Sequence, residues 1–290
     1  MNGLEFRNFC EADYDAVCDF LIAINAPDRA HIHWNWARFE WMYEHPECDK
    51  SLLGSIGLWR DGDRIVGAAI YDMYFGEAFC GVLPEYASLY PEVLDYACRA
   101  LKDENGLAIA INDQNSAEIE AAKAAGFASI EQTETLLRIA LNRPLAASLP
   151  DGLRFGSFDP LEDANALGWL FWQGFDHGTD RAEFEREEQP VSEIRKHFNQ
   201  DLNVIAVNET GEPVAIAGVW YLPETDYAYV EPVCTIPAYR GKGVGRAVVN
   251  EALNRARALG AKCAYVISDQ TFYKRLGFAL DSHFTFYRKG

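Results

Sequence analysis

A glycine-rich segment in the second half of the chain places the tightest constraint on the fold. Residues 239–246 read Tyr-Arg-Gly-Lys-Gly-Val-Gly-Arg, between an apolar run typical of a buried strand and a stretch with apolar residues at helical spacing. The helical pattern begins at Val244 and ends before Gly260, a residue type that commonly terminates helices. The sequence therefore predicts a strand that enters this turn and a helix that leaves it.

The turn has the composition of an anion-binding site. Its three glycines are Gly241, Gly243 and Gly245, and its three basic residues are Arg240, Lys242 and Arg246. Glycines allow backbone N–H groups to converge on one point, and the following helix directs the positive end of its dipole there. Neither the dinucleotide-binding spacing nor the P-loop pattern is present. We therefore expect this turn to bind a phosphate or pyrophosphate in a site that is neither a dinucleotide-binding fold nor a P-loop.

Two motifs in the expected order resemble those of the GNAT acetyltransferase superfamily. Val233 to Gly245 resembles its acyl-coenzyme A signature, Gln/Arg-x-x-Gly-x-Gly/Ala between a strand and a helix, with a proline and an aromatic residue before it. Downstream, Phe272 to Phe278 is similar to the second mark of that family. The resemblance extends from Leu153 to Arg288. On these motifs the second half is identified as a member of the superfamily.

The resemblance implies which residues hold the acyl donor, acetyl-coenzyme A. The strand end would bind the pantetheine arm through the backbone of Val233, Cys234 and Thr235. The pyrophosphate would lie on the turn and first helical residues, which are Arg240, Gly241, Lys242, Gly243, Val244, Gly245 and Arg246. The thioester would then point into a fork between this strand and the one that ends near Ser268. No metal ion is implied.

Two residues are candidates for acid–base catalysis. By similarity, Tyr273 corresponds to the general-acid tyrosine of the family; the alternative is a tyrosine that packs beside Phe272 and Phe278. Glu231 lies on the strand that leads into the signature, where apolar neighbours could raise its pKa towards that of a base. The alternative for Glu231 is an ion pair with a neighbouring cation. Cys234 is expected in the core rather than as a covalent nucleophile, since cysteine is among the most buried residue types.

The two halves of the chain repeat one order of elements. Each has a short strand, a helical region with an acidic start, a pair of strands around a polar turn, and then strand, short helix, Gly-Phe and strand. The linker around Ala146 contains two prolines and small residues. We therefore expect an α/β (α+β) protein of two tandem GNAT-like domains, residues 1–145 and 146–290, each with a mixed, mostly antiparallel sheet flanked by helices.

The first half lacks the acyl-coenzyme A signature. Where the glycine turn should be, residues 81–91 have neither the paired glycines nor a basic cluster, and no tyrosine precedes Gly126-Phe127. This half therefore resembles a GNAT repeat that has lost donor binding and that shapes the substrate channel instead. Its aromatic stretch, Trp34 to Tyr43, is expected to pack against the other domain, with a pocket for a cationic amine as the alternative. His31-x-His33 lacks a third ligand at a recognisable metal-binding spacing.

Composition narrows the partners and the compartment. The net charge of -18 disfavours binding to nucleic acid or an anionic membrane and weakly favours a cationic partner, although an acidic surface also serves solubility alone. The seven cysteines contain no Cys-x-x-Cys pair and are expected as reduced core thiols. No membrane-spanning run or export signal is recognised, so a cytoplasmic protein is expected. Homodimerisation is compatible with the sequence.

The function indicated is that of an acetyl-coenzyme A-dependent N-acetyltransferase. The acetyl group would move directly from the thioester to a primary amine, a small-molecule or peptide acceptor and preferably a small cationic amine. The alternative is a non-catalytic acyl-coenzyme A-binding sensor. Such a sensor needs the donor pocket but not the acid, so the presence of Tyr273 favours the enzyme.

Overall fold

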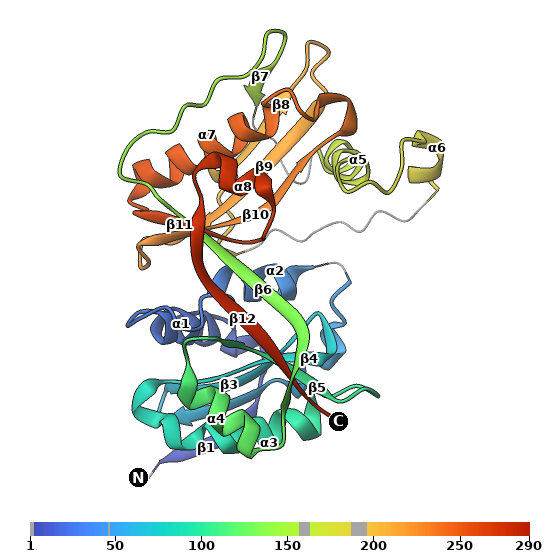
Figure 1. Cartoon of the computed structure of the whole chain (residues 1–290). Coiled ribbons are helices and arrows are strands. Elements are labelled where there is room, and N and C mark those ends of the chain that lie inside the picture. Colours follow the sequence, from blue (N-terminus) through green and yellow to red (C-terminus); the bar gives the residue numbers. More distant parts are fainter. Residues whose placement is uncertain (1–2, 46, 157–162, 187–195) are drawn as a thin grey trace. The chain divides into compact units, whose positions relative to one another are not determined.

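A computed structural model describes residues 3–45, 47–156, 163–186 and 196–290, which form two compact units. The first unit consists of residues 1–136, 267–269 and 280–290, and the second of residues 137–266 and 270–279. Both have mixed sheets with helices on them (Figure 1). Each unit is described by itself below.

The first unit has the strand order β1-β2-β3-β4-β5-β12, and residues 128–136 of β6 (Ala128–Ala140) also belong to it. Its strands are β1 (Leu4–Asn8), β2 (Gly57–Asp61), β3 (Arg64–Asp72), β4 (Tyr74–Val82), β5 (Leu107–Asn112) and β12 (Ala279–Lys289). Its helices are α1 (Tyr14–Asn25), α2 (Trp36–Glu44), α3 (Tyr90–Ala100) and α4 (Ser116–Ala124). All neighbouring strands are antiparallel except β4 and β5. Helices α1 and α3 pack on the central strand β3, which is apolar and buried along most of its length.

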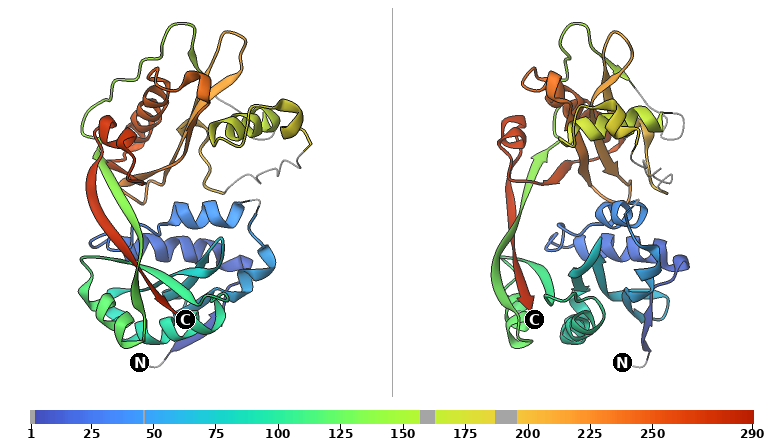
Figure 2. Two further views of the ribbon diagram at one scale, coloured as in Figure 1. Left: turned by 45° about the vertical axis from the view of Figure 1, so that its right-hand side comes forward. Right: turned by 90° about the vertical axis from the view of Figure 1, so that its right-hand side faces the viewer.

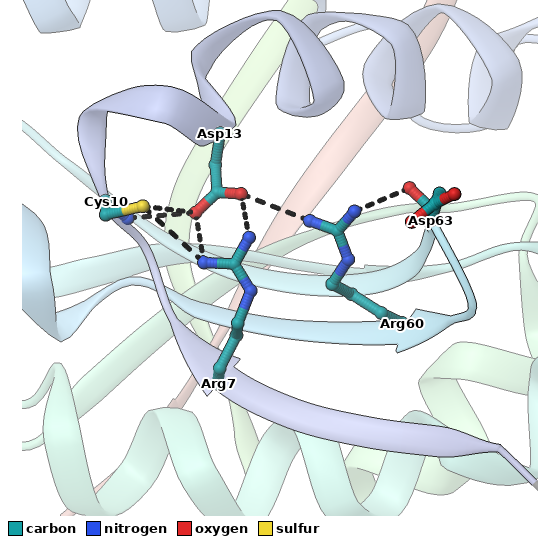
Figure 3. A network of polar contacts seen from close by, with 5 residues as sticks. All are labelled: Arg7, Cys10, Asp13, Arg60 and Asp63. Atoms are coloured by element: carbon teal, nitrogen blue, oxygen red, sulfur yellow. Dashed lines mark hydrogen bonds and ion pairs between the residues drawn. The ribbon is translucent and has the colours of Figure 1, made fainter.

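A polar network fixes the start of α1 on the edge of this sheet (Figure 3). The buried Asp13 carboxylate accepts hydrogen bonds from both terminal nitrogens of Arg7, from the Cys10 backbone N–H at 3.0 Å and from Arg60 Nη1 at 3.1 Å. Burial would raise the pKa of Asp13, but the hydrogen bonds from Cys10 and Arg7 lower it. The network therefore joins β1, β2 and α1 through one satisfied buried charge.

In the second unit, residues 137–140 of β6 are followed in the strand order by β11, β10, β9, β8 and β7. The other strands of this unit are β7 (Arg154–Gly156), β8 (Asn203–Val207), β9 (Pro213–Tyr221), β10 (Tyr227–Thr235) and β11 (Cys263–Ile267). Its helices are α5 (Ala164–Gly174), α6 (Arg181–Phe184), α7 (Val244–Leu259) and α8 (Thr271–Leu276). Helix α7 crosses β8, β9 and β10 and buries its apolar stripe on them, while α5 packs on β9 and β10 with a separate apolar cluster.

Each of the two long strands β6 and β12 contains residues of both units. They are neighbours in the sheet, and both views in Figure 2 show them as adjacent ribbons. The C-terminal residues 280–290 complete the first unit by pairing with β5, from Phe284 opposite Asn112 to Lys289 opposite Leu107. Residues 137–140 of β6 belong to the second unit. The two expected domains, divided at residue 145, are each one continuous segment, whereas each compact unit consists of more than one segment of the chain.

Local predictions from the sequence agree with most of the observed elements. The strand pairs around residues 61–63 and 209–212 are confirmed as β2–β3 and β8–β9, and the helix from Val244 ends before Gly260 as expected. All seven cysteines are free thiols; five are buried as predicted, whereas Cys98 is half-buried and Cys10 is exposed. The acidic helix start expected at residues 159–162 lies outside the described residues. None of the helices in the described ranges has the length and apolar character needed to cross a bilayer.

Candidate functional site

The glycine-rich turn joins the end of β10 to the start of α7. Gly241 and Gly243 have φ angles of +73° and +83°, in the left-handed region that side chains disfavour. Gly243 is the N-cap residue of the 16-residue helix α7. These two glycines therefore allow the chain to reverse sharply and begin a helix without strain.

The backbone of this turn presents a run of unpaired donors. Among the described residues, no hydrogen-bond acceptor is found for the N–H groups of residues 241–246, and the first such bond of α7 runs from Ala247 N to Gly243 O at 3.1 Å. The first turn of α7 contains no acidic residue. Six N–H groups at the positive end of a long helix are suited to bind an anion of phosphate or pyrophosphate type.

Gly245 is required for close packing and not for an unusual backbone conformation. A Cβ atom at this position would lie 3.0 Å from Thr235 Oγ1 and 3.5 Å from two ring atoms of Phe272. The first turn of α7 can therefore lie against both the end of β10 and helix α8. This contact holds the anion-binding turn beside Tyr273, the next residue after Phe272.

The three basic side chains of the turn have different surroundings. Lys242 and Arg246 are exposed, and the Lys242 ammonium lies 5.3 Å from the Tyr239 ring centroid. The Arg240 guanidinium instead makes hydrogen bonds to the carbonyls of Thr235 and Gly174 and an ion pair with Asp176. All three were predicted to bind the donor; in the structure, the contacts of Arg240 lead away from the turn.

Strands β10 and β11 diverge beside this turn and form a fork. They pair in parallel only from Tyr227 opposite Cys263 to Tyr229 opposite Tyr265, although β10 continues to Thr235. Past this point the register between β10 and β9 shifts between Val230 and Val233, which is a β-bulge. The separation of the strands matches the fork expected from the resemblance.

Glu231 lies in the bulge at the mouth of the fork. Its carbonyl accepts a hydrogen bond from Trp220 Nε1 at 2.9 Å. Opposite the bulge, a Cβ on Gly218 would lie 2.6 Å from that same carbonyl oxygen, so the position requires glycine. The partly buried Glu231 is thereby held where β10 leaves β11.

Tyr273 lies in α8 with an 8% exposed side chain. Its ring makes edge contacts with Phe272 and Phe278, at centroid distances of 5.0 and 5.6 Å. Its hydroxyl has no hydrogen-bond partner within the described part of the chain, and burial together with the charge of Glu231 raises the pKa of Tyr273 to about 12. Tyr273 therefore packs beside Phe272 and Phe278, as the alternative predicted. Its phenol also keeps its proton at neutral pH, and the charge of Glu231 contributes to this.

The strand end predicted to bind pantetheine follows the bulge. Val233, Cys234 and Thr235 pair with β9 along one edge, and β11 does not pair with them along the other. The Cys234 thiol is buried, donates to Leu170 O at 3.9 Å, and has its pKa raised by burial to about 12. Cys234 is therefore a core thiol, as expected, and is unsuited to be a nucleophile.

Helix α5 borders the same strand end and was not recognised from the sequence. Its aromatic residues are Trp169, Phe171 and Trp172, and Phe175 follows directly. Phe171 and Phe175 stack at 5.8 Å. A Cβ on Gly174 would lie 2.5 Å from Cys234 Sγ, so this glycine lets α5 approach β10 closely. The density of aromatic residues was the one available signal, since Gly174 acts through a contact distant in sequence.

In the first unit, the corresponding fork between β4 and β5 is filled by the chain itself. These strands pair at Glu77 opposite Ala108. Beyond that point, the rings of His31, His33 and Trp34 contact Phe79 of β4 at centroid distances of 5.9, 6.2 and 6.1 Å. Asn112 of β5 donates to Ala30 O at 3.4 Å. We call residues 30–34 the plug.

The two histidines of the plug contact other residues of the first unit. His31 Nε2 lies 2.7 Å from Glu118 Oε1 of α4, and the His33 ring packs against Phe284 at 4.0 Å. Trp34 is buried and precedes α2, which begins at Trp36 with Asn35 as its N-cap. Trp34, the first residue of the aromatic stretch, therefore lies outside the helix.

A hollow of about 400 Å³ adjoins the anion-binding turn in the second unit. It is lined by Tyr239, Lys242 and Val244 of the turn, by residues 150–153 of the linker and by residues 208–210 between β8 and β9. The hollow could accept a group attached to an anion on the turn.

Comparison with protein families assigns residues 165–278 to the model of the acetyltransferase (GNAT) family. This range contains the turn, the fork, Glu231 and Tyr273. A comparison with curated protein sequences gives no significant match.

Solved structures similar to the whole chain have the same fold. A tandem GNAT protein from the clavulanic acid biosynthesis pathway is 18% identical with a TM-score of 0.63, covering 99% of this chain and 98% of that one. A GCN5-related N-acetyltransferase from Sphaerobacter thermophilus is 16% identical with a TM-score of 0.61, covering 100% and 96%. The N-myristoyltransferase of Saccharomyces cerevisiae, solved with myristoyl-CoA, is 14% identical with a TM-score of 0.55, covering 99% and 78%.

Proposed function

We propose that the protein transfers an acetyl group from acetyl-coenzyme A to a primary amine, since residues 165–278 match the model of the acetyltransferase (GNAT) family. One observation carries the proposal: six unpaired N–H groups at the start of α7 lie next to a fork that has Glu231 at its mouth and Tyr273 beside it. An anion site alone would fit many ligands. Its combination with an acid–base pair fits acyl transfer.

The donor would be held in three parts. Its pyrophosphate would accept from the N–H groups of residues 241–246, with Lys242 and Arg246 adding charge. Its pantetheine arm would lie along Val233, Cys234 and Thr235, at the edge of β10 that β11 leaves unpaired. Its adenosine portion would use the hollow beside Lys242. Bound in this way, acetyl-coenzyme A supplies an acetyl thioester at the fork.

Glu231 is the candidate base. A neutral amine nitrogen must attack the thioester carbonyl, so a C–N bond forms, the C–S bond breaks, and the nitrogen loses a proton. A carboxylate at the mouth of the fork can accept that proton directly or through a water molecule. The hydrogen bond from Trp220 to the Glu231 carbonyl holds the backbone from which this carboxylate side chain extends.

Tyr273 would act on the departing sulfur. With a pKa of about 12, its phenol keeps its proton at neutral pH, as a donor must. A free thiol has a pKa of about 8.5, so complete proton transfer from this phenol to a thiolate is uphill. We therefore assign Tyr273 the donation of a hydrogen bond to the developing thiolate, which stabilises the charge without requiring full transfer.

The acceptor is proposed to be a small cationic amine or an amine of a peptide. The chain has 44 acidic and 26 basic residues, so a positively charged acceptor is attracted to it at long range. Residues 1–145 are proposed to be a degenerate repeat that does not bind the donor and that shapes the acceptor channel. The plug between β4 and β5 supports this assignment.

The test combines donor binding with turnover in one preparation. We expect calorimetry to detect acetyl-coenzyme A binding and thiol release to appear with at least one member of a panel of amines. Tyr273→Phe should bind acetyl-coenzyme A as the wild type does and lower kcat by about 100-fold, with no loss of stability because the hydroxyl makes no internal hydrogen bond. Equal rates for Tyr273→Phe and the wild type would remove Tyr273 from the mechanism. Binding without turnover on any amine would favour the sensor.

A further inference from the structure

We propose that Arg240, the first residue of the acyl-coenzyme A signature, is a positioning residue that clamps the end of α5 to the end of β10 and does not bind the donor pyrophosphate through its side chain. The proposal rests on the proposed function for the location of the donor. The clamp itself rests on contacts within the second unit.

Each nitrogen of the Arg240 guanidinium contacts an acceptor in the protein, while 42% of the side chain stays exposed. Nε donates to Thr235 O at 2.9 Å, and Nη2 donates to Gly174 O at 2.8 Å. Nη1 lies 2.9 Å from Asp176 Oδ1 and 3.1 Å from Asp176 Oδ2. Each of the three nitrogens of the planar group therefore has a partner, and the plane is directed at α5.

The partners on α5 form the end of that helix. Gly174 is its last residue, and the final carbonyl groups of a helix have no partner within it. Arg240 supplies one to Gly174 O, with its positive charge at the negative end of the helix dipole. Asp176 has a φ of +63°, a left-handed conformation that aspartate tolerates and that turns the chain after the helix. The clamp thus ends α5 and fixes the turn that follows.

The clamp joins two elements that must lie close together. A Cβ on Gly174 would lie 2.5 Å from Cys234 Sγ, so the end of α5 lies close to β10, and Arg240 donates to Thr235 O on the same strand. The aromatic pair of Phe171 and Phe175 is carried by the same end of α5. Because the guanidinium is occupied, the positive charges left for the donor are those of Lys242 and Arg246. The three basic residues of the turn therefore have two different roles.

The experiment separates the two roles with matched variants. Arg240→Lys keeps the charge but loses the planar set of donors. Asp176→Asn removes the negative charge of the ion pair without altering Arg240. Arg246→Ala removes a basic side chain that, among the described residues, makes no hydrogen bond or ion pair with α5. Hydrogen exchange is followed at the amides of residues 175–177, which donate to Phe171 O, Gln173 O and Trp172 O. Coenzyme A, the probe ligand, is titrated by calorimetry at low and high salt.

The clamp predicts opposite patterns for the variants. Arg240→Lys and Asp176→Asn should raise exchange at residues 175–177 by about tenfold and change coenzyme A affinity by less than about threefold. Arg246→Ala should weaken coenzyme A binding by about tenfold, reduce its salt dependence, and leave that exchange unchanged.

Two results would overturn the clamp. One is unchanged exchange in both Arg240→Lys and Asp176→Asn. The other is tighter coenzyme A binding by Asp176→Asn, because a side chain released from its ion pair would then serve the pyrophosphate. If the wild type does not bind coenzyme A, the proposed function fails, yet the exchange measurements still decide whether the clamp exists.

Discussion

The two units contain the same fork between parallel strands but occupy it differently. In the second unit, β10 and β11 separate after Tyr229, and the adjoining turn presents unpaired N–H groups. In the first unit, β4 and β5 pair at Glu77, and the plug fills the space against Phe79 with its own rings. Similar strand orders thus produce either a candidate binding site or a packed core.

The turn after each fork explains which outcome follows. After β4, the chain forms a 3-10 helix (Pro84–Leu89) and then enters α3 at Tyr90–Pro91. The acidic residues Glu85 and Glu92 lie in the first turns of these helices. There their negative charges interact favourably with the positive ends of the helix dipoles and would repel a bound anion. After β10, glycines and cations take those places. The anion site is therefore a property of the turn and not of the sheet.

Placing one negative charge in each turn gives the largest expected contrast. Gly243→Glu should abolish coenzyme A binding, a loss of more than about 5 kcal/mol, because a carboxylate takes the place of the pyrophosphate and several charge-assisted hydrogen bonds are lost. Ser88→Glu introduces the same charge at an exposed position of the first unit and should leave binding unchanged. Calorimetry with coenzyme A measures both.

Gly243→Asn serves as the control for backbone strain. Asparagine tolerates the left-handed conformation and carries no charge, so this variant should retain measurable binding. If Gly243→Asn and Gly243→Glu lose binding equally, the conformation of the turn and not its charge decides. If Ser88→Glu weakens coenzyme A binding, the proposal that the donor binds the turn after β10 and not the turn after β4 is wrong.

Emptying the fork of the first unit should cost stability without creating a second donor site. Trp34→Ala removes a side chain that is 2% exposed and stacked on Phe79, at a cost of about 3–5 kcal/mol in the free energy of unfolding. Trp34→Phe keeps a ring there and should cost less than about 2 kcal/mol. Urea unfolding measures both.

The binding stoichiometry completes that test. Coenzyme A should still bind Trp34→Ala at one molecule per chain, because the turn after β4 has no glycine in the left-handed region and no cation. A second molecule bound to Trp34→Ala would show that the plug alone had closed a functional site.

The elements around the donor site were predictable because their signals are local. The glycine turn, the helix from Val244 and the strand that enters it follow from spacing within about 30 residues, and the structure has them where expected. The site residues Glu231 and Tyr273 came from the family resemblance, and their electrostatic coupling appears only in the folded chain. The sequence could locate these residues but not their distance from one another.

The features that the sequence did not predict depend on pairings between residues that are distant along the chain. The pairing of Phe284 with Asn112 completes the first unit with the end of the chain, and no pattern in either strand specifies its partner. Arg240 looked like a phosphate ligand because its charge is in the motif, whereas its partners, Gly174 and Asp176, are more than 60 residues away. Such partners are set by tertiary packing.

The smallest expected effect concerns the ion pair that anchors the plug. Burial alone would lower the pKa of His31, but Glu118 at 2.7 Å, assisted by Asp28, raises it above the ordinary value of 6.5. A histidine with a raised pKa in the folded state stabilises it fully below about pH 6.5, and this contribution is lost as pH rises through the folded-state value. Glu118→Gln should therefore cost about 1–2 kcal/mol at pH 6 and less at pH 9.

The Trp34 amide, which donates to His31 O at 2.9 Å, reports on this anchor through hydrogen exchange. After correction for the intrinsic effect of pH on exchange, the difference in opening free energy between Glu118→Gln and the wild type should shrink from pH 6 to pH 9. Glu120→Gln, on the same helix, should show no such trend. A cost for Glu118→Gln that is equal at both pH values would mean that Glu118 only accepts a hydrogen bond from a neutral His31. The fork of the first unit would then be closed by packing alone, as its stacked rings already allow, and charge would distinguish only the fork of the second unit.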